Sequence, residues 1–237
     1  MENSKIIKEN QRAIGFIDVL IPDKSDPKKA QRSIRGTGFF VSTDGKFLTN
    51  AHVYLEVKET EREFLGFNVI SQSDEKGITS YRRYPIEMLK LDQENDLALF
   101  KIKSDPNLSF DKIRQMGALK DVNEGDEVLI MGHPLATELL MMGVGITAIA
   151  TQCIVSSIKR KAIDGSLHFF FVGTHINLGS SGSPVFSKKT GELIGIVSAR
   201  IGTKIPLPDL QNNKAMEIPA NIGICRPVEY LKELINK

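Results

Sequence analysis

Three short segments of the chain carry the side chains that acyl transfer by a serine requires. His52 lies in LTNAHV, Asp96 in NDLAL and Ser181 in GSSGSP. An imidazole can take a proton from a hydroxyl, a carboxylate can orient that imidazole, and a serine on a glycine-rich turn can attack a carbonyl. These residues therefore predict a catalytic triad with His52 as general base, Asp96 as its orienting carboxylate and Ser181 as nucleophile.

The order of the three residues along the chain distinguishes between folds that use such a triad. His52 precedes Asp96 by 44 residues, and Asp96 precedes Ser181 by 85. Histidine, then aspartate, then serine is the chymotrypsin order, whereas subtilisins and α/β-hydrolases have other orders. The G-x-S-x-G motif of α/β-hydrolases is also absent. The spacing suits a first barrel that carries His52 and Asp96 and a second that carries Ser181.

The elements that must position these residues are mostly short strands between turns. Asp44-Gly45 between two apolar runs is a strong hairpin signal. The predicted strands are 13–21, 38–42, 46–49, 96–103, 127–131, 153–158, 167–172, 183–186, 193–199 and 222–225. Residues 227–236 predict a helix with one apolar face, and the Pro-containing segments 21–33 and 203–220 predict loops. Many short strands with one terminal helix indicate an all-β barrel or sandwich.

Composition excludes several classes of protein. The chain has 237 residues, of which 41% are hydrophobic and 25% charged, as in ordinary globular proteins. A net charge of +2 argues against a dedicated nucleic-acid binder. Neither a signal peptide nor an apolar run long enough to span a membrane is visible, so a cytoplasmic protein is predicted. The four histidines show no metal-site spacing, and no metal or cofactor is expected.

Three longer stretches resemble the trypsin-like serine peptidases of chymotrypsin fold. They are TGFFVSTDGKFLTNAH (37–52), NDLALFKI (95–102) and GSSGSPVF (179–186). Within that family the chain resembles the bacterial HtrA/Deg proteases and the glutamyl endopeptidases, and NIGICRPVEYLKELI (221–235) resembles the last strand and helix of HtrA protease domains. The resemblance runs from about Gly36 to the C-terminus.

The resemblance implies a fold and a set of roles. It implies two six-stranded antiparallel β-barrels and a C-terminal helix in one domain over 1–237, at about 13–115, about 120–226 and 227–236, with no PDZ domain following. The backbone N–H groups of Gly179 and Ser181 would form the oxyanion hole. Ser180 stands where digestive relatives carry an aspartate that pairs with a newly cut N-terminus. Activation of that kind is therefore not expected.

The same resemblance places the primary substrate pocket. Its implied lining is His175, Ile176, Val197, Ser198, Ala199 and Arg200. His175 occupies the position of the aspartate at the floor of the trypsin pocket, which disfavours cleavage after Lys or Arg; a structural hydrogen bond is its favoured role. Val197 stands where glutamyl endopeptidases have a specificity histidine, although His175 and Arg200 could still attract an acidic side chain. The leading expectation is a small or medium aliphatic residue at P1, the substrate residue before the cleaved bond.

Two features leave alternatives open. The apolar segment 136–150, ATELLMMGVGITAIA, either forms an exposed surface for a partner or regulator, or folds over the second barrel as core. Cys153 and Cys225 are predicted to be buried free thiols, with a bridge between them as the alternative.

These observations predict a serine endopeptidase that cleaves a restricted set of protein or peptide substrates through an acyl-enzyme. Low basal activity is expected, raised by an activating protein partner or by loop ordering. The rival hypothesis is a catalytically silent module that holds a peptide strand in the cleft by β-strand addition. A second rival is an esterase or acyltransferase, which shares the acyl-enzyme route.

Overall fold

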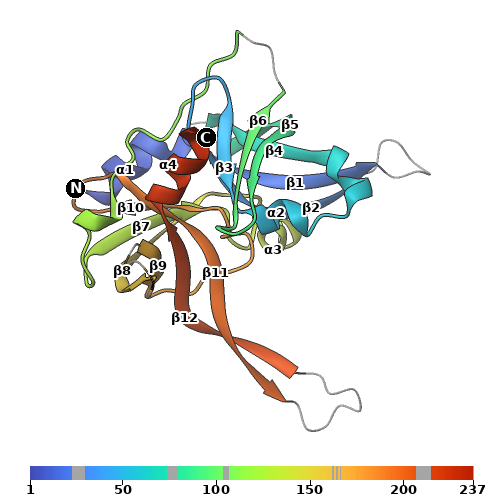
Figure 1. Cartoon of the computed structure of the whole chain (residues 1–237). Helices are drawn as coiled ribbons and strands as arrows, with labels where there is room; N and C mark the ends of the chain where they lie inside the picture. Colours follow the sequence, from blue (N-terminus) through green and yellow to red (C-terminus); the bar gives the residue numbers. More distant parts are fainter. Residues whose placement is uncertain are drawn as a thin grey trace.

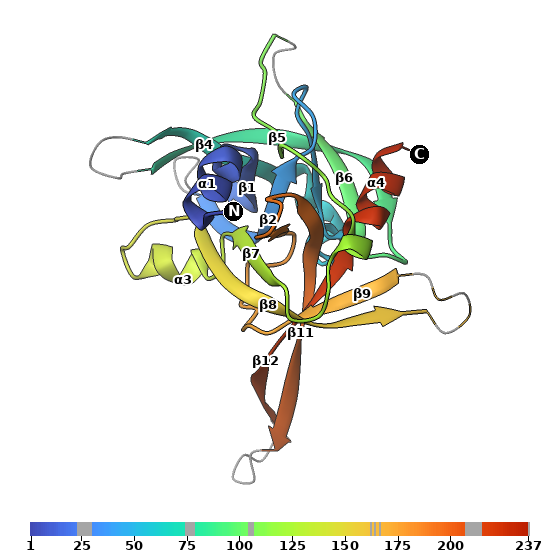
Figure 2. The same ribbon diagram turned by 90° about the vertical axis from the view of Figure 1, so that its left-hand side faces the viewer.

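The computed structural model of the chain describes residues 1–22, 30–73, 79–103, 107–161, 163, 165, 167–206 and 215–236. Twelve strands close into two antiparallel barrels of six strands each (Figures 1 and 2). A helix follows the last strand. The predicted fold class is therefore confirmed.

The two barrels follow one another along the chain. The first contains β1 (Ile14–Pro22), β2 (Ala30–Phe40), β3 (Lys46–Thr49), β4 (Leu65–Ser73), β5 (Thr79–Asp92) and β6 (Leu97–Ile102), in the neighbour order β1-β2-β3-β6-β5-β4. The second contains β7 (Glu127–Gly132), β8 (Ile149–Arg160), β9 (Leu167–Val172), β10 (Pro184–Ser187), β11 (Leu193–Pro206) and β12 (Ala215–Pro227), in the order β10-β11-β12-β9-β8-β7. The α-helices are α1 (Asn3–Asn10), α2 (Ala51–Leu55), α3 (Ala136–Met141) and α4 (Val228–Asn236), and short 3-10 helices span Gln11–Ala13, Glu59–Phe64 and Leu119–Asp121.

Three apolar clusters hold this arrangement together. The interior of the first barrel is rich in phenylalanine, and the rings of Phe47 and Phe67 stack with centroids 4.1 Å apart. The second barrel is filled mainly by aliphatic side chains and also buries Cys153 and Cys225, which are free thiols. A third cluster joins residues of both barrels to α1 and α4. Because such interiors are close-packed, this third cluster fixes the two barrels relative to each other.

The two terminal helices differ in how well the sequence reveals them. In α4, Val228, Leu231 and Leu234 are buried in the third cluster, and the apolar face predicted for this helix is confirmed. The helix α1 was not predicted, because only Ile6 and Asn10 of its residues are buried. A single buried apolar side chain gives no helical periodicity that could be recognised.

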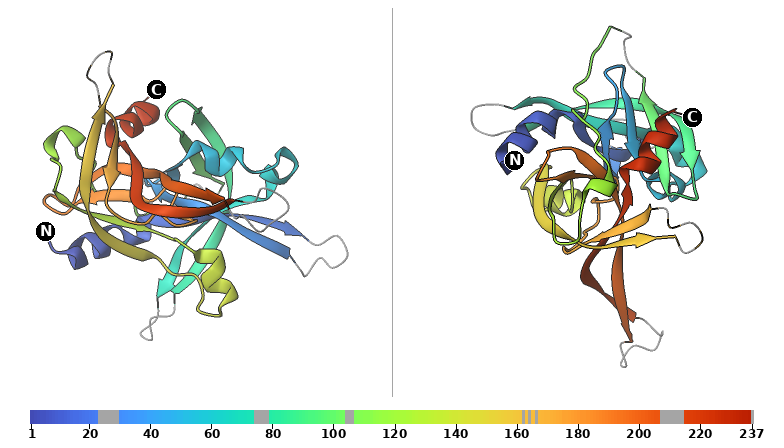
Figure 3. Two further views of the ribbon diagram at one scale, coloured as in Figure 1. Left: turned by 90° about the horizontal axis from the view of Figure 1, so that it is seen from below. Right: turned by 60° about the vertical axis from the view of Figure 1, so that its left-hand side comes forward.

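Two predicted loops are partly strand. β2 already begins at Ala30, β11 extends to Pro206, and β12 begins at Ala215. Residues 23–29 and 207–214 lie outside the described part of the chain. The far half of the β11–β12 hairpin projects away from both barrels (Figures 1 and 3). The loop prediction was wrong for 203–206 and 215–220, because prolines are tolerated where the ladder is irregular. Pro219 pairs with Gly202 next to such a register shift.

The strands β4 and β5, between His52 and Asp96, also escaped prediction. The exposure of β5 does not alternate regularly along its 14 residues, and Pro85 interrupts its sequence although it pairs with Gly66 of β4. No helix among the described residues is long and apolar enough to cross a membrane.

Candidate active site

The three predicted triad residues come from different elements and meet in one cleft. His52 lies in α2, Asp96 in the turn between β5 and β6, and Ser181 in the turn before β10. The first two belong to the first barrel and the third to the second barrel. All three line a cleft of about 520 Å³.

The turn that carries Asp96 is built by its own polar side chains. The carboxylate of Asp92 accepts hydrogen bonds from the backbone N–H of Asn95 at 3.0 Å and from its side-chain amide at 2.8 Å. Asp96 then adopts φ +55°, a left-handed conformation that aspartate tolerates better than most residues. This turn brings the Asp96 carboxylate to the start of α2.

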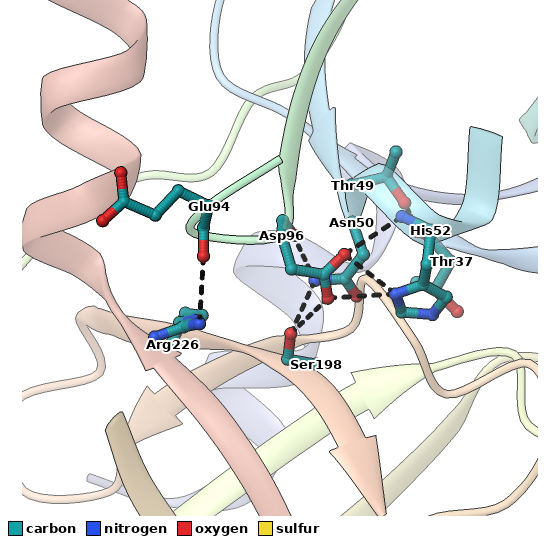
Figure 4. A network of polar contacts seen from close by, with 8 residues as sticks. All are labelled: Thr37, Thr49, Asn50, His52, Glu94, Asp96, Ser198 and Arg226. Carbon is teal, nitrogen blue, oxygen red and sulfur yellow. Dashed lines mark hydrogen bonds and ion pairs between the residues drawn. The ribbon is translucent and has the colours of Figure 1, made fainter. Parts of the chain in front are cut away.

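The His52 imidazole and the Asp96 carboxylate form a close pair (Figure 4). His52 Nδ1 lies 2.9 Å from Asp96 Oδ2 and 3.0 Å from Oδ1, and the backbone N–H of His52 donates to Oδ1 at 3.0 Å. The Ser198 hydroxyl donates to Asp96 Oδ2 at 2.5 Å. The carboxylate thus occupies Nδ1, which leaves Nε2 as the ring nitrogen available to a group in the cleft.

The environment of the pair shifts both pKa values toward the charged forms. Burial alone would raise the pKa of Asp96, but hydrogen bonds from His52 and Ser198 and the adjacent imidazole outweigh it and lower that pKa. Burial alone would lower the pKa of His52, but the hydrogen bond and negative charge of Asp96 raise it above its usual 6.5. The carboxylate therefore stabilises an imidazolium at this position.

Asn50 holds the backbone of Asp96 and the hydroxyl of Ser198 in place, a contribution that was not predicted from the sequence. Its fully buried side-chain amide donates to the backbone carbonyl of Asp96 at 3.0 Å and to Ser198 Oγ at 3.2 Å. Because the Ser198 hydroxyl accepts from Asn50, its hydrogen is directed to the Asp96 carboxylate. Asn50 stands two positions before His52, within the motif that carries the histidine, and this position was the only available signal.

The turn that carries Ser181 is formed by two glycines in the left-handed region. Gly179 and Gly182 both have φ +86°, and a Cβ on Gly182 would lie 1.9 Å from the carbonyl oxygen of Thr37. Among the described residues, the backbone N–H groups of Gly179 and Ser181 have no hydrogen-bond acceptor, and Ser181 Oγ makes no hydrogen bond to His52. The turn therefore presents a hydroxyl and two unpaired amide donors.

Four of the six predicted pocket residues line the cleft together with the predicted triad. They are Ile176, Ser198, Ala199 and Arg200. His175 is exposed and does not line the cleft; it borders a smaller hollow of about 30 Å³ that shares Ile176 and Asn177 with the cleft. Val197 is fully buried in the interior of the second barrel. Successive side chains of a strand point to opposite faces, so Val197 points inward from β11 while Ser198 reaches Asp96.

A second cavity continues the cleft beyond the nucleophile turn. It has a volume of about 310 Å³ and shares four lining residues with the cleft: Arg35, Glu56, Leu178 and Gly179. The remaining lining comes from Ile34 and from the start of α3. The result is one groove that runs from β11 past Ser181 to α3. Sequence reasoning did not identify Arg35 or Glu56, because neither lies in a recognisable motif.

The apolar segment 136–150 lies mostly at the surface. Leu140, Met141, Met142 and Val144 are 45%, 83%, 75% and 62% exposed, whereas Ala136 is buried. α3 lies at the periphery of the molecule (Figure 2). The alternative that this segment forms core is therefore wrong for these four side chains. Within the described ranges, no group of three or more His, Cys, Asp or Glu residues is placed to hold a metal ion.

Comparison with known proteins finds a family and several relatives. A family model described as a trypsin-like peptidase domain matches residues 36–196. A probable periplasmic serine endoprotease, DegP-like, of Chlamydia pneumoniae is 29% identical over 208 residues, which cover 83% of this chain and 36% of the relative. A protein of the same description from Marinomonas sp. (strain MWYL1) is 32% identical over 176 residues, covering 74% of this chain and 32% of the relative. The chain thus spans well under half the length of these curated relatives.

The solved structures include a similar fold. The HtrA-type protease AlgW with decapeptide matches with a TM-score of 0.66 and 21% sequence identity, over 100% of this chain and 67% of that one. At this identity the match supports the fold alone. The family model and the sequence relatives confirm the resemblance to trypsin-like and HtrA-like proteins that the motifs predicted.

Proposed function

The chain belongs to the family of trypsin-like peptidase domains, and from this membership we propose that it is a serine endopeptidase. One observation carries the proposal: a single cleft contains the His52–Asp96 pair, the Ser181 hydroxyl and two backbone N–H groups that find no acceptor in the described part of the chain. These are the parts that acyl transfer by a serine requires.

Each part has a defined task in the proposed reaction. Ser181 Oγ attacks the carbonyl carbon of the scissile peptide while His52 Nε2 takes the hydroxyl proton. The N–H groups of Gly179 and Ser181 donate to the oxygen that becomes negative. When the C–N bond breaks, His52 passes the proton to the leaving amine, and an ester to Ser181 remains. Water, activated by the same histidine, then hydrolyses the ester and restores the hydroxyl.

The groove suggests how a substrate lies. Ser198, Ala199 and Arg200 border one end, which the family resemblance assigns to the residues before the cleaved bond, and α3 borders the other, where the leaving peptide would lie. The small side chain of Ala199 and the apolar Ile176 favour a small or medium aliphatic residue at P1. An apolar pocket discriminates only weakly among such residues, so we propose that specificity depends on the whole length of the groove.

We also propose that a protein partner raises the activity. The exposed apolar side chains that follow Leu139 form a surface of the kind that marks interaction sites. This surface connects to the catalytic turn through Leu135, whose backbone N–H donates to the carbonyl of Leu178, next to Gly179, at 2.7 Å. Leu135 has φ +53°, which is unfavourable for leucine. A partner that moves α3 would therefore act on the turn directly.

The rival function is a binding module that holds a peptide in the same groove without cleaving it. The observation in its favour is that Ser181 Oγ makes no hydrogen bond to His52 within the described residues. Catalytic hydrogen bonds are often long or absent in enzymes without substrate, and they form in the complex. This geometry is therefore compatible with an enzyme at rest.

Fluorophosphonate labelling of the purified protein tests the proposal. Such reagents phosphonylate a serine only when it is activated, so we expect labelling at Ser181, located by mass spectrometry, and its loss in Ser181→Ala. Ser109→Ala, which removes an exposed hydroxyl outside the cleft, is the matched control and should label like the parent. If the parent remains unlabelled with and without lysate of the source cell, the endopeptidase proposal is wrong and the binding module is favoured.

The cytoplasmic location remains a prediction, since the bacterial relatives are described as probable periplasmic endoproteases.

The proposed dependence on a partner has its own test. Purified protein with high activity on unfolded casein would contradict it.

A further inference from the structure

Thr37 of the first barrel holds the nucleophile turn of the second barrel. Its side chain is fully buried. Its hydroxyl donates to the carbonyl of Gly179 at 2.8 Å, and its backbone N–H donates to the carbonyl of Ser181, also at 2.8 Å. One residue thus contacts the turn on both sides of the nucleophile.

A neighbouring donor fixes the direction of the Thr37 hydroxyl. The backbone N–H of His133 donates to Thr37 Oγ1 at 3.0 Å. Because that oxygen already accepts a hydrogen bond, its own hydrogen is free to point to Gly179. The hydroxyl therefore connects three backbone segments, in β2, after β7 and before β10.

The carbonyls of four successive residues in the turn are held. Leu178 accepts from Leu135 N–H at 2.7 Å, and Ser180 accepts from Ser183 N–H at 3.0 Å. Gly179 and Ser181, between and after them, are held by Thr37. Of these four hydrogen bonds, one uses a side chain, that from the Thr37 hydroxyl.

This arrangement determines where the free amide groups point. In a trans peptide the N–H of one residue points away from the C=O of the residue before it. The held carbonyls of Leu178 and Ser180 therefore direct the N–H groups of Gly179 and Ser181 to the opposite side. Thr37 fixes the two peptide units on either side of the Ser181 N–H. Glycine at 179 offers little resistance to rotation of its own, so the turn depends on these external contacts.

We propose that Thr37 is a positioning residue for the oxyanion donors, an inference that rests on the proposed endopeptidase function. Without its hydroxyl, the peptide unit between Gly179 and Ser180 keeps only the hydrogen bond from the Ser180 N–H to the carbonyl of Asn177 at 3.1 Å. Its carbonyl is then free to tilt, and the neighbouring N–H groups are held less firmly toward the position where negative charge develops. Preorganised donors are effective because they need no reorganisation during the reaction.

Two variants of Thr37 and one matched control test this role. Thr37→Val keeps the shape and removes the hydroxyl, whereas Thr37→Ser keeps the hydroxyl. Thr49→Val is the control. Thr49 is also a fully buried threonine, and its hydroxyl donates to the backbone carbonyl of Thr37 at 2.7 Å. Unlike Thr37, it makes no hydrogen bond to the carbonyl of Gly179. Thr37→Ala provides a second deletion that avoids any clash, and each variant is checked by circular dichroism and thermal melting.

The main measurement is the second-order rate constant of fluorophosphonate labelling, together with the Ki of a peptide boronate that has valine at P1. Both probes place an oxygen in the oxyanion site. For Thr37→Val we expect slowing by about tenfold to a hundredfold, less than the 10²–10³ lost with a complete oxyanion donor. The Ki should rise in proportion. On a cleaved peptide kcat should fall with little change in KM. Thr37→Ser should restore most of the rate.

The outcomes distinguish failure of the endopeptidase function from failure of the positioning role of Thr37. If the parent is labelled neither alone nor in lysate of the source cell, the endopeptidase function fails, and the role of Thr37 fails with it. If the parent is labelled and the deletions react within about twofold of it, the role of Thr37 alone is overturned. Equal losses in Thr37→Val, Thr37→Ser and Thr49→Val would indicate a merely structural contribution and would also overturn it.

Discussion

The two barrels contribute to the candidate active site in different ways. The first barrel provides side chains: the imidazole of His52, the carboxylate of Asp96 and the amide of Asn50 form a network with Ser198 of the second barrel (Figure 4). The second barrel provides a turn whose backbone conformation, with Gly179 and Gly182 in the left-handed region, presents one hydroxyl and two N–H groups. In the proposed reaction, proton transfer thus depends on side-chain chemistry, and oxyanion binding depends on backbone shape.

This difference predicts which substitutions the side-chain network and the turn can each tolerate. The side-chain network fails when one functional group is removed, although the fold is expected to remain. The turn fails when its backbone is strained, although every functional group is still present. Substitutions in the two halves should therefore separate catalysis from stability.

The largest effect on catalysis is expected for His52→Ala. Loss of the general base should lower kcat by about 10⁶, as removing the histidine of another serine protease triad does. The melting temperature should change little, because the imidazole is partly exposed in the cleft. His168→Ala, which removes a histidine at Arg226 away from the cleft, is the control and should retain activity. The measurement is the initial rate on a cleaved peptide, and equal losses in both variants would contradict the assignment of His52.

Asp96→Asn should have the next largest effect. The amide keeps the shape but removes the negative charge and holds the wrong histidine tautomer, so kcat should fall by about 10⁴. The cause that raises the pKa of His52 is then lost, and burial should lower this pKa instead. Titration of the His52 ring by NMR in both proteins measures the shift. An unchanged pKa would show that Asp96 does not act on His52.

The turn is tested by two alanine substitutions at glycines with positive φ. Gly182 has φ +86° and no space for a Cβ, whereas Gly125 has φ +93° and open space around it. Gly125→Ala should lower the free energy of unfolding by about 1–2 kcal/mol, the usual cost of the left-handed conformation. Gly182→Ala should lower it by more than about 4 kcal/mol or prevent folding, because Thr37 and Thr49 cannot move without disturbing the interface. Urea denaturation compares the two, and equal losses would refute the packing argument.

Ser198→Ala should have a smaller effect, since Asp96 keeps its bonds to His52. A hydrogen bond to a charged group contributes roughly 1.5–3 kcal/mol. If its loss raises the activation free energy by that amount, kcat/KM should fall by about tenfold to a hundredfold. The pKa of Asp96 should rise, because one of the hydrogen bonds that lower it is removed. Steady-state kinetics at several pH values would measure both changes. A rate equal to that of the parent would show that the Ser198 contact does not matter.

The pH dependence of the unmodified protein is the mildest test. His52 acts as a base only when neutral, and its pKa is raised above 6.5, so kcat/KM should fall on the acid side with a midpoint above pH 6.5. The free energy of unfolding changes in the opposite direction as the pH rises. A pKa raised by folding favours the folded state below pH 6.5, and this contribution is lost as the pH rises through the raised pKa. A pH–rate profile with its acid midpoint below 6.5 would contradict the proposed pairing.

The sequence by itself predicted the fold class, the order and identity of the triad candidates, the terminal helix and the family. These features depend on local motifs and on the order of segments, both of which can be read along the chain. The strand β5 and the outer parts of β11 and β12 could not be predicted, because their prolines and charged residues are stabilised by pairing with a neighbouring strand.

Only the tertiary structure decided which residues support the motifs. Thr37, Asn50 and Ser198 act through contacts that close when the two barrels pack together. It also decided that Val197 faces the interior, that His175 lies outside the cleft, and that Leu140, Met141, Met142 and Val144 remain exposed. The physical reason is that burial and hydrogen bonding between distant segments depend on how the barrels pack, whereas a motif records only what stands side by side in the chain.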